Sequence, residues 1–249
     1  MPQAIAIIPA RYASQRFPGK VLADRTGKPL IQHVYERVCR ADLVERVIVA
    51  TDDRRVFDAV EAFGGEAMMS RGEHVNGTSR IAEVACDLDA SVIVNVQADE
   101  PEIEPDLVDT AIRCLDDHPG CPVATLASPF CSDEDPADPN IVKVVVDAAG
   151  RALYFSRALI PCDRDGDAGK PALKHLGLYA YRREFLLDFA RLAPTPLERI
   201  ERLEQLRVLE HGHHIAVAIV TAQYHGIDTP EQYDDFVKRR LRGTVERTK

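Results

Sequence analysis

The chain has 249 residues, of which 45% are hydrophobic and 29% charged, and its formal net charge is −9. This length and apolar content suffice for one large domain with a real core, and the acidic balance argues against broad nucleic-acid binding. No apolar run reaches the roughly 20 residues of a membrane span, and the first residues lack the basic region of a signal peptide. We therefore expect a cytoplasmic protein with neither membrane nor nucleic-acid partners.

The first half of the chain alternates strand and helix signals. A short apolar strand, 4–8, breaks at Pro9, and further strands are expected at 46–51, 67–69, 91–97 and 122–127. Helices are expected between them at 30–40, 54–63, 78–88 and 105–116. Continuous apolar strands that alternate with amphipathic helices predict an α/β fold, a mostly parallel sheet flanked by helices.

The pattern changes after about residue 130. Strands are expected at 141–146, 152–155, 175–181 and 215–220, with a hairpin turn at 147–150, and helices at 197–210 and 230–241. We predict a single domain, 1–249, in which 130–215 forms a smaller inserted or mixed-topology lobe. The last helix is expected to return to the main sheet.

The loop after the first strand is cationic and ends in Pro-Gly-Lys. Arg11, Arg16 and Lys20 follow the carboxyl end of a buried strand, the edge at which open α/β sheets bind ligands. The spacing fits neither a Walker P-loop nor a G-x-G-x-x-G turn. The dense positive charge indicates a polyphosphate site, and the alternative is a solvated turn with surface charges.

Two carboxylates are placed to hold a metal at the same edge. Asp99 follows the strand 91–97, and Asp228 precedes the last helix. Carboxylates together with a polyphosphate are a usual Mg²⁺ arrangement. Each could instead only cap a helix or start a turn.

A third patch lies at 71–80. The Asn76-Gly77-Thr78 turn at a helix start, together with Arg71, supplies donors that could read a base or a sugar. The alternative for this turn is a plain helix cap.

The second half supplies side chains suited to an acidic, hydroxyl-rich ligand such as a carboxylated sugar: Arg157, Arg164, His175, Tyr179, Glu201 and Gln205. His175 and Tyr179 are four apart on a strand and so share a face. Glu201 and Gln205 are i and i+4 on the expected helix 197–210 and project together. For Glu201 an exposed salt-bridge face remains the alternative.

With these motifs the chain resembles the 3-deoxy-manno-octulosonate cytidylyltransferases, also called CMP-KDO synthetases. The motifs run in one order over nearly the full length: IIPARYASQRFPGK, VIVATDD, NGTSRIAEV, VIVNVQADEP, PNIVKVV, ALYFSRALIP, KHLGLYAYR, LERIERLEQLRVLEHG and GIDTPEQYDDF. The resemblance implies a Rossmann-like nucleotidyltransferase fold whose smaller mixed β/α part serves dimerisation and sugar binding. It also implies a homodimer and Mg²⁺-dependent transfer of CMP from CTP to KDO for lipopolysaccharide biosynthesis.

The resemblance also implies residue roles. It places the CTP phosphates on Arg11 and Lys20, with Ala10 and Ser14 in the same loop, and magnesium on Asp99 and Asp228. By the same resemblance, five residues lie at the nucleotide: Arg71, Asn76, Gly77, Thr78 and Gln97. Gln97 also lies near the sugar. Six residues face the sugar acid: Arg157, Arg164, His175, Tyr179, Glu201 and Gln205.

Three positions depart from the family's usual pattern. Ala98 replaces the glycine of V-Q-G-D, Asn76 the serine of S-G-T, and Cys162 the tryptophan of P-W-D-R. A methyl group at Ala98 narrows the approach to the nucleotide or fixes a negative φ. The departures leave open the same chemistry on another ulosonic acid, such as 8-amino-KDO, and a non-catalytic nucleotide-binding module.

Overall fold

The structure, a computed structural model, describes residues 4–14, 16–71, 74, 76–165, 172–221 and 226–246. Its strands are β1 (Ala4–Ala10), β2 (Val44–Thr51), β3 (Glu66–Met69), β4 (Val92–Asn95), β5 (Val123–Pro129), β6 (Lys143–Val146), β7 (Ala152–Ser156), β8 (Leu173–Arg182) and β9 (Ile215–Ile219). Its helices are α1 (Leu30–Val38), α2 (Arg54–Ala62), α3 (Gly77–Cys86), α4 (Pro105–Asp117), α5 (Arg183–Phe189), α6 (Pro196–Glu201), α7 (Gln205–Glu210) and α8 (Pro230–Glu246), with a 3₁₀ turn, η1, at Lys20–Leu22.

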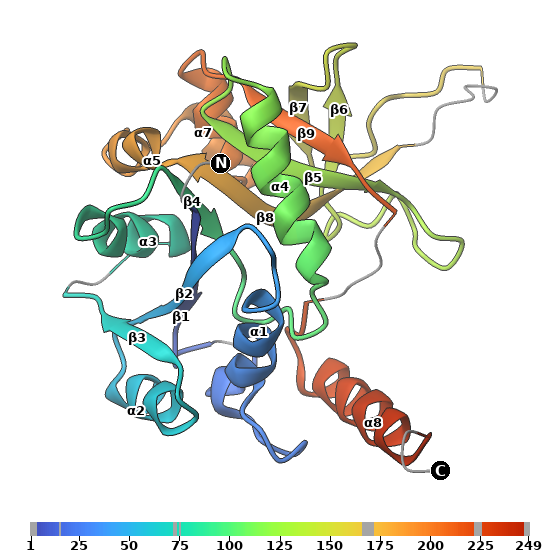
Figure 1. The fold of residues 1–249 in the computed structure, drawn as a ribbon. Helices are drawn as coiled ribbons and strands as arrows, with labels where there is room; N and C mark the ends of the chain where they lie inside the picture. Colours follow the sequence, from blue (N-terminus) through green and yellow to red (C-terminus); the bar gives the residue numbers. More distant parts are fainter. Residues whose placement is uncertain are drawn as a thin grey trace.

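One sheet organises the molecule, in the strand order β3-β2-β1-β4-β8-β5-β9 (Figure 1). The first four of these strands are parallel, and β5 and β9 are parallel to each other. β8 runs antiparallel to both of its neighbours, β4 and β5. The predicted α/β class with a mostly parallel sheet is confirmed, although the reversed strand in its centre was not foreseen.

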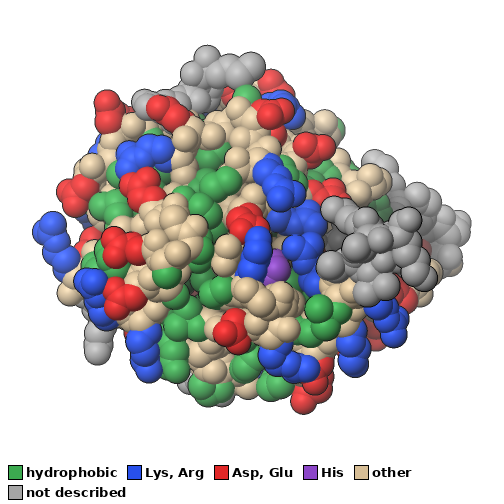
Figure 2. Space-filling view, turned by 60° about the horizontal axis from the view of Figure 1, so that its bottom comes forward, with side chains coloured by type: hydrophobic (Ala, Val, Ile, Leu, Met, Phe, Trp, Pro, Cys, Tyr) green, Lys and Arg blue, Asp and Glu red, His purple; other side chains and the backbone are tan. Residues whose placement is uncertain are grey.

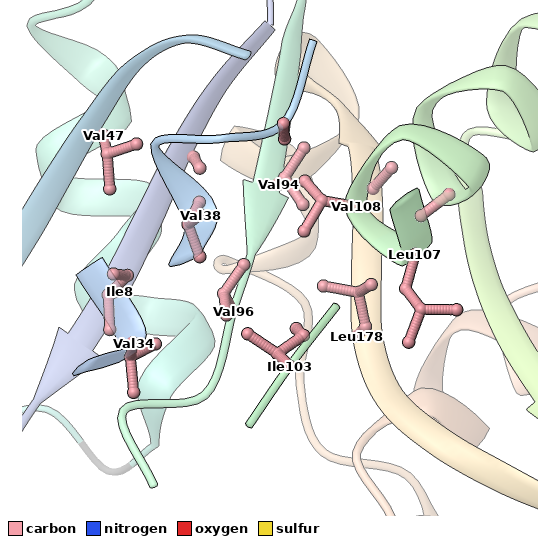
Figure 3. Packing of buried hydrophobic residues seen from close by; sticks show 14 of the residues in the cluster. Ile8, Val34, Val38, Val47, Val94, Val96, Ile103, Leu107, Val108 and Leu178 are labelled. Atoms are coloured by element: carbon pink, nitrogen blue, oxygen red, sulfur yellow. The ribbon is translucent and has the colours of Figure 1, made fainter. Parts of the chain in front are cut away.

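Helices cover both faces of the sheet. Along β1, Ile5 and Ile7 pack with residues of α3 and α5 on one face, whereas Ala6 and Ile8 pack with α1 and α4 on the other. Figure 3 shows this second layer, in which Val34 and Val108 from the helices meet strand and loop side chains. Alternate residues of a buried strand serve opposite layers, which explains the uninterrupted apolar runs in the sequence.

The predicted hairpin at 147–150 is confirmed, whereas the predicted small lobe is not tested. β6 and β7 pair antiparallel around the predicted turn, and β6 also pairs with the start of β8. The rest of β8 lies in the central sheet. The division into one domain with a lobe at 130–215 therefore stays a prediction.

The expected end of the first strand at Pro9 is wrong, because β1 continues to Ala10. Pairing of β1 with β4 ends at Ile7, while pairing with β2 extends to Thr51. Pro9 thus has a ladder partner on one side only, where its missing N–H is tolerated.

The single helix expected at 197–210 is divided into α6 and α7. Arg202 adopts a left-handed backbone, with φ of 53°, and ends α6. No glycine or proline announces this break in the sequence, so the periodic pattern runs straight across it. Glu201 and Gln205 therefore do not share a helix face as predicted.

The last helix does not return to the sheet, contrary to expectation. Tyr233, Phe236 and Val237 of α8 pack on Leu30 at the start of α1, and Figure 1 shows α8 beside α1, at the edge of the molecule. Among the described helices, none combines the length and apolar character needed to cross a membrane.

Candidate functional site

The loop after β1 closes on itself and presents Lys20. The Gly19 N–H donates to the Tyr12 carbonyl at 3.0 Å, and Gly19 adopts φ of 69°, which favours glycine. A Cβ at Gly19 would also lie 3.2 Å from the Tyr12 ring. The backbone conformation thus favours glycine here, and a side chain would also crowd the Tyr12 ring. The turn places Lys20 at the carboxyl edge of the sheet.

Lys20 joins the two predicted metal ligands. Its Nζ donates to Asp99 Oδ2 at 2.7 Å, to Asp228 Oδ1 at 3.1 Å and to the Ile227 carbonyl at 2.9 Å. Arg16 pairs with Asp228 Oδ2 at 2.9 Å. The Ile227 N–H donates to the Asp99 carbonyl at 2.8 Å, which ties the segment before α8 to the end of β4. The structure therefore brings together residues that are more than a hundred positions apart.

The donor set at this point fits a magnesium ion. Asp99 and Asp228 offer oxygen ligands on either side of an ammonium group, so a positive charge already lies between them. Mg²⁺ commonly uses one or two carboxylates and completes its shell with phosphate oxygens and water. Among the described residues there is no group of three or more His, Cys, Asp or Glu side chains that could hold a metal ion.

A cavity of about 240 Å³ is lined by residues predicted to hold the nucleotide or its magnesium ion: Arg11, Ser14, Lys20, Gly77, Gln97 and Asp99. Ala98 also lines it, so the departure from the family pattern faces the cavity. Ala10 lies buried at the end of β1, directly before Arg11. The predicted set from the first half is thus largely assembled at one edge of the sheet.

Arg11 also lines a second cavity, of about 430 Å³, with Asp52, His74 and Arg80. The Arg11 Nη2 donates to the His74 carbonyl at 2.7 Å. Burial and the neighbouring Arg80 lower the pKa of Arg11. The guanidinium of Arg80 is buried and donates to Asp52 Oδ2 at 2.6 Å. Figure 2 looks at the molecule with the bottom of Figure 1 turned toward the reader. On this face, basic and acidic side chains lie close to a histidine.

Asn76 is the N-cap of α3, since its Oδ1 accepts from the Ser79 N–H at 2.9 Å. Its Nδ2 donates to Glu204 Oε1 at 2.6 Å, and Thr78 Oγ1 donates to Glu204 Oε2 at 2.7 Å. Burial raises the pKa of Glu204. In the sequence Glu204 is one of several charged residues in its stretch, and nothing there assigns it a role. In the structure its carboxylate connects the nucleotide-side turn to the α6–α7 segment.

His175 and Tyr179 share one face of β8, as predicted, with ring centroids 5.4 Å apart. The His175 Nε2 lies 3.0 Å from Thr125 Oγ1, which also donates to the Leu178 carbonyl at 2.8 Å. Burial lowers the pKa of His175 to about 3, so the imidazole is neutral near pH 7. Burial also raises the pKa of Tyr179.

Two further predicted sugar-side residues, Glu201 and Arg157, bind each other and nearby protein groups. Glu201 accepts from Ser156 Oγ at 2.6 Å and from the Arg157 N–H at 3.0 Å. The Arg157 guanidinium donates to the carbonyls of Glu201 at 2.8 Å and Pro139 at 2.9 Å. These two groups are engaged within the protein, and their contact with a sugar stays a prediction.

Three further predicted residues do not line the two cavities described so far. Arg71 has a side chain that is 88% exposed, 3.8 Å from Asp87. Arg164 is exposed in the segment before residue 166. Gln205 is buried at the start of α7, next to Glu204.

A parallel α/β sheet with cationic and acidic groups around a cavity at its carboxyl edge defines a nucleotide-binding α/β protein. The chain belongs to the cytidylyltransferase family, whose model matches residues 5–215.

Curated relatives extend the likeness over nearly the whole chain. A 3-deoxy-manno-octulosonate cytidylyltransferase of Geobacter metallireducens is 53% identical over 247 residues, covering 95% of this chain and 97% of the relative. The enzyme of that name from Syntrophobacter fumaroxidans is 53% identical over 237 residues, covering 94% and 95%.

Solved structures agree with the fold. A CMP:2-keto-3-deoxy-manno-octonic acid synthetase complexed with CTP superposes with a TM-score of 0.92 at 44% identity, covering 97% of this chain and 99% of that one. A 4-diphosphocytidyl-2C-methyl-D-erythritol synthase from Anaerococcus prevotii gives a TM-score of 0.63 at 14% identity, covering 96% of each chain. This second likeness concerns the fold alone.

Proposed function

We propose that this protein transfers CMP from CTP to KDO, giving CMP-KDO and pyrophosphate for lipopolysaccharide biosynthesis. The observation that carries the proposal is the convergence of Lys20, Asp99 and Asp228 beside the cavity that Arg11 and Gln97 line. The full-length likeness to relatives named for this reaction supports the choice of substrates.

The reaction requires an in-line attack of the anomeric 2-hydroxyl of KDO on the α-phosphorus of CTP. Negative charge develops on the α-phosphate and on the leaving pyrophosphate. In this proposal Arg11 and Lys20, which line one cavity, bind these phosphates and stabilise that charge. A protein nucleophile is not needed, because the sugar hydroxyl is the nucleophile and positioning supplies much of the rate.

Asp99 and Asp228 would hold Mg²⁺, which when bound acts as a Lewis acid toward the phosphate oxygens. Asp99 lines the nucleotide cavity. Before a metal enters, Lys20 holds the two carboxylates close together. Loss of this ammonium contact on metal binding would free Lys20 for the phosphates.

We also propose that the protein works as a cytoplasmic homodimer. Leu153 on β7, Leu159 after it and Ile200 on α6 are 60%, 50% and 76% exposed, respectively. The Ser156–Glu201 hydrogen bond joins β7 to α6, so these apolar side chains lie on neighbouring segments. A second copy that buries them would explain their exposure. Light scattering of the purified chain should give twice the chain mass, and Ile200→Glu should shift it toward the monomer.

The test of activity is pyrophosphate release from CTP and Mg²⁺ across a panel of ulosonic acids. KDO should give the highest kcat/KM, and omission of Mg²⁺ should abolish release. A higher kcat/KM with 8-amino-KDO would reassign the sugar while leaving the chemistry. No release with any sugar acid would overturn the enzyme proposal in favour of a nucleotide-binding module, which CTP binding by calorimetry would then detect.

A further inference from the structure

The backbone of Asp228 is bonded to the first turn of α8. Gln232 Oε1 accepts from the N–H groups of Asp228 at 2.7 Å and Thr229 at 3.0 Å. In return, the Gln232 N–H donates to Thr229 Oγ1 at 3.3 Å. This reciprocal arrangement is a capping box, and it makes the position of Asp228 follow the position of α8.

α8 packs on an apolar cluster of its own, which we call the α8 cluster. Tyr233, Phe236 and Val237 of α8 meet Ile227 and Leu30 there, each at most 5% exposed. In the described part of the chain this cluster is distinct from the two that cover the faces of the sheet. Figure 1 shows α8 beside α1, at the edge of the molecule. A substitution in the α8 cluster can therefore release the helix without opening the main core.

The ion pairs around α8 are exposed and stabilise it weakly. Arg25 pairs with Asp234, and Arg239 pairs with Glu102 at 2.6 Å. The two arginine side chains are 60% and 51% exposed, respectively, and surface pairs of this kind contribute little in water. The position of α8 therefore depends mainly on apolar contacts, which do not change when ions at the site rearrange.

The cationic loop after β1 reaches the same cluster through Phe17. Phe17 packs against the α8 cluster, and its ring centroid lies 5.6 Å from that of Tyr233, with an interplanar angle of 54°. Tyr233 Oη also accepts from the Arg25 N–H at 2.9 Å. The loop that carries Lys20 and the helix that follows Asp228 thus share one aromatic contact.

Asp228 needs a contact of this kind because its other contacts depend on charge. Asp99 and Asp228 both bind the Lys20 ammonium, and two carboxylates repel each other when no cation lies between them. In the proposed reaction Lys20 turns to the phosphates, and the Ile227 carbonyl then also loses its bond from Lys20. The apolar contacts of α8 remain throughout this exchange.

We propose that Tyr233, together with Phe17, is a positioning residue that acts through α8 to hold Asp228 beside Asp99 for the binding of magnesium. This inference rests on the proposed function, because it takes Asp228 as a metal ligand, and it deepens that function. Tyr233 lines neither of the two cavities of the site. A chain with α8 displaced must return the helix to its place before it binds the metal, which weakens the apparent metal affinity.

Variants of the full chain separate this role from general stability. Tyr233→Ala removes the ring and the hydroxyl, and Tyr233→Phe keeps the ring. Tyr35→Ala is the matched control, because the Tyr35 ring lies 5.5 Å from Phe63 and its hydroxyl accepts from the Glu66 N–H at 3.1 Å. The same kinds of contact are then lost beside β3 instead. Phe17→Leu trims the aromatic contact from the loop side and is the milder variant if Tyr233→Ala folds poorly.

The first measurement needs neither metal nor substrate. Hydrogen exchange of the metal-free protein should become about tenfold faster or more at the amides of 232–241 in Tyr233→Ala, because a large buried side chain is lost from the α8 cluster. Amides of β1 should keep their wild-type rates. Tyr35→Ala should leave exchange in α8 unchanged.

The second measurement is CTP affinity by calorimetry, once with Mg²⁺ and once with EDTA. Tyr233→Ala should weaken CTP binding about tenfold in Mg²⁺ and less than about twofold in EDTA, because only the metal-dependent part of binding involves Asp228. The Mg²⁺ concentration for half-maximal pyrophosphate release should rise by a similar factor, with kcat at saturating Mg²⁺ within about twofold. Phe17→Leu should shift the same quantities about threefold, and Tyr233→Phe should stay near wild type.

Faster exchange in α8 with unchanged CTP affinity in Mg²⁺ would overturn the inference, as would unchanged exchange in α8. An equal loss of CTP affinity in EDTA, or in Tyr35→Ala, would overturn it too. Failure of the proposed function gives a different result, because the wild-type chain itself then releases no pyrophosphate with KDO. Exchange and CTP binding are measured without the sugar and decide on Tyr233 in either case.

Discussion

The proposed nucleotide edge and the proposed sugar side of this molecule are built in different ways. At the nucleotide edge, Lys20 and Asp99 follow neighbouring parallel strands, and ion pairs hold them together with Asp228. On that second side, His175 and Tyr179 lie on the antiparallel strand β8, and their half-buried rings make uncharged contacts. Glu204 bridges the two regions through Asn76 and Thr78.

The two regions use different forces because the proposed substrates need different contacts. Polyphosphate and metal need charge of both signs, and the open edge of a parallel sheet supplies it from strand ends. A sugar needs directional hydrogen bonds from groups with fixed positions, which burial and backbone contacts provide. The nucleotide edge should therefore respond mainly to changes of charge, and the sugar side to changes of shape and hydrogen bonding.

The largest expected effect is that of Asp99→Asn. This substitution keeps the shape but removes a ligand charge, so kcat should fall by about a hundredfold or more. Rates are measured at saturating CTP, KDO and Mg²⁺, with melting temperature as the folding check. Asp234→Asn, in an exposed pair with Arg25, is the matched control. Near-wild-type rates for Asp99→Asn at saturating Mg²⁺ would show that Asp99 is no metal ligand.

A smaller loss of rate, about tenfold or more, is expected for Lys20→Met, because one phosphate-binding cation is removed. Without the ammonium, Asp99 and Asp228 repel each other, and the free energy of unfolding should drop in metal-free buffer. Added Mg²⁺ should then raise the melting temperature of the variant more than that of the wild type. An equal Mg²⁺ response in both would contradict the shared position of ammonium and metal.

Glu204→Gln probes the bridge between the two regions. The variant's amide oxygen can still accept from the Asn76 Nδ2 group, but its N–H then faces Thr78, whose hydroxyl must turn round and accept. The two hydrogen bonds also lose the charge of the carboxylate, so both are weakened. KM for both CTP and KDO should rise about fivefold. Glu66→Gln is the control, since its half-exposed carboxylate on β3 pairs with Arg46 on β2 instead. A rise confined to one substrate would show that Glu204 serves one region only.

The smallest effect concerns the pH dependence of stability. The pKa of His175 is about 3 when folded, against 6.5 for an ordinary histidine, so the unfolded chain binds the extra proton between these values. The contribution of this group to the free energy of unfolding is thus fully present above pH 6.5. It falls as the pH drops toward 3, by at most about 1.4 kcal/mol per pH unit. Thermal melts from pH 7 to pH 5 should show a shallower loss for His175→Gln. An equal fall of melting temperature with pH in the wild type and the variant would contradict an imidazole kept neutral by burial.

Much of the fold could be predicted from the sequence because apolar runs and helix caps are local signals. Asn76 as a cap, the hairpin around 147–150 and most strands follow from such signals. The break at Arg202 could not be predicted, since a non-glycine residue in a left-handed conformation is held by its surroundings. The placement of α8 on α1 depends on contacts between distant segments, which a helical pattern does not specify.

The cationic loop with Lys20 and the carboxylates of Asp99 and Asp228 could be predicted from local patterns, because the carboxyl ends of parallel strands meet at one edge of a sheet. Long-range pairing was needed to place β8 in the sheet in reversed direction and to join Glu204 to Asn76. These features arise from pairing and burial between segments far apart in the chain, and no local pattern encodes them.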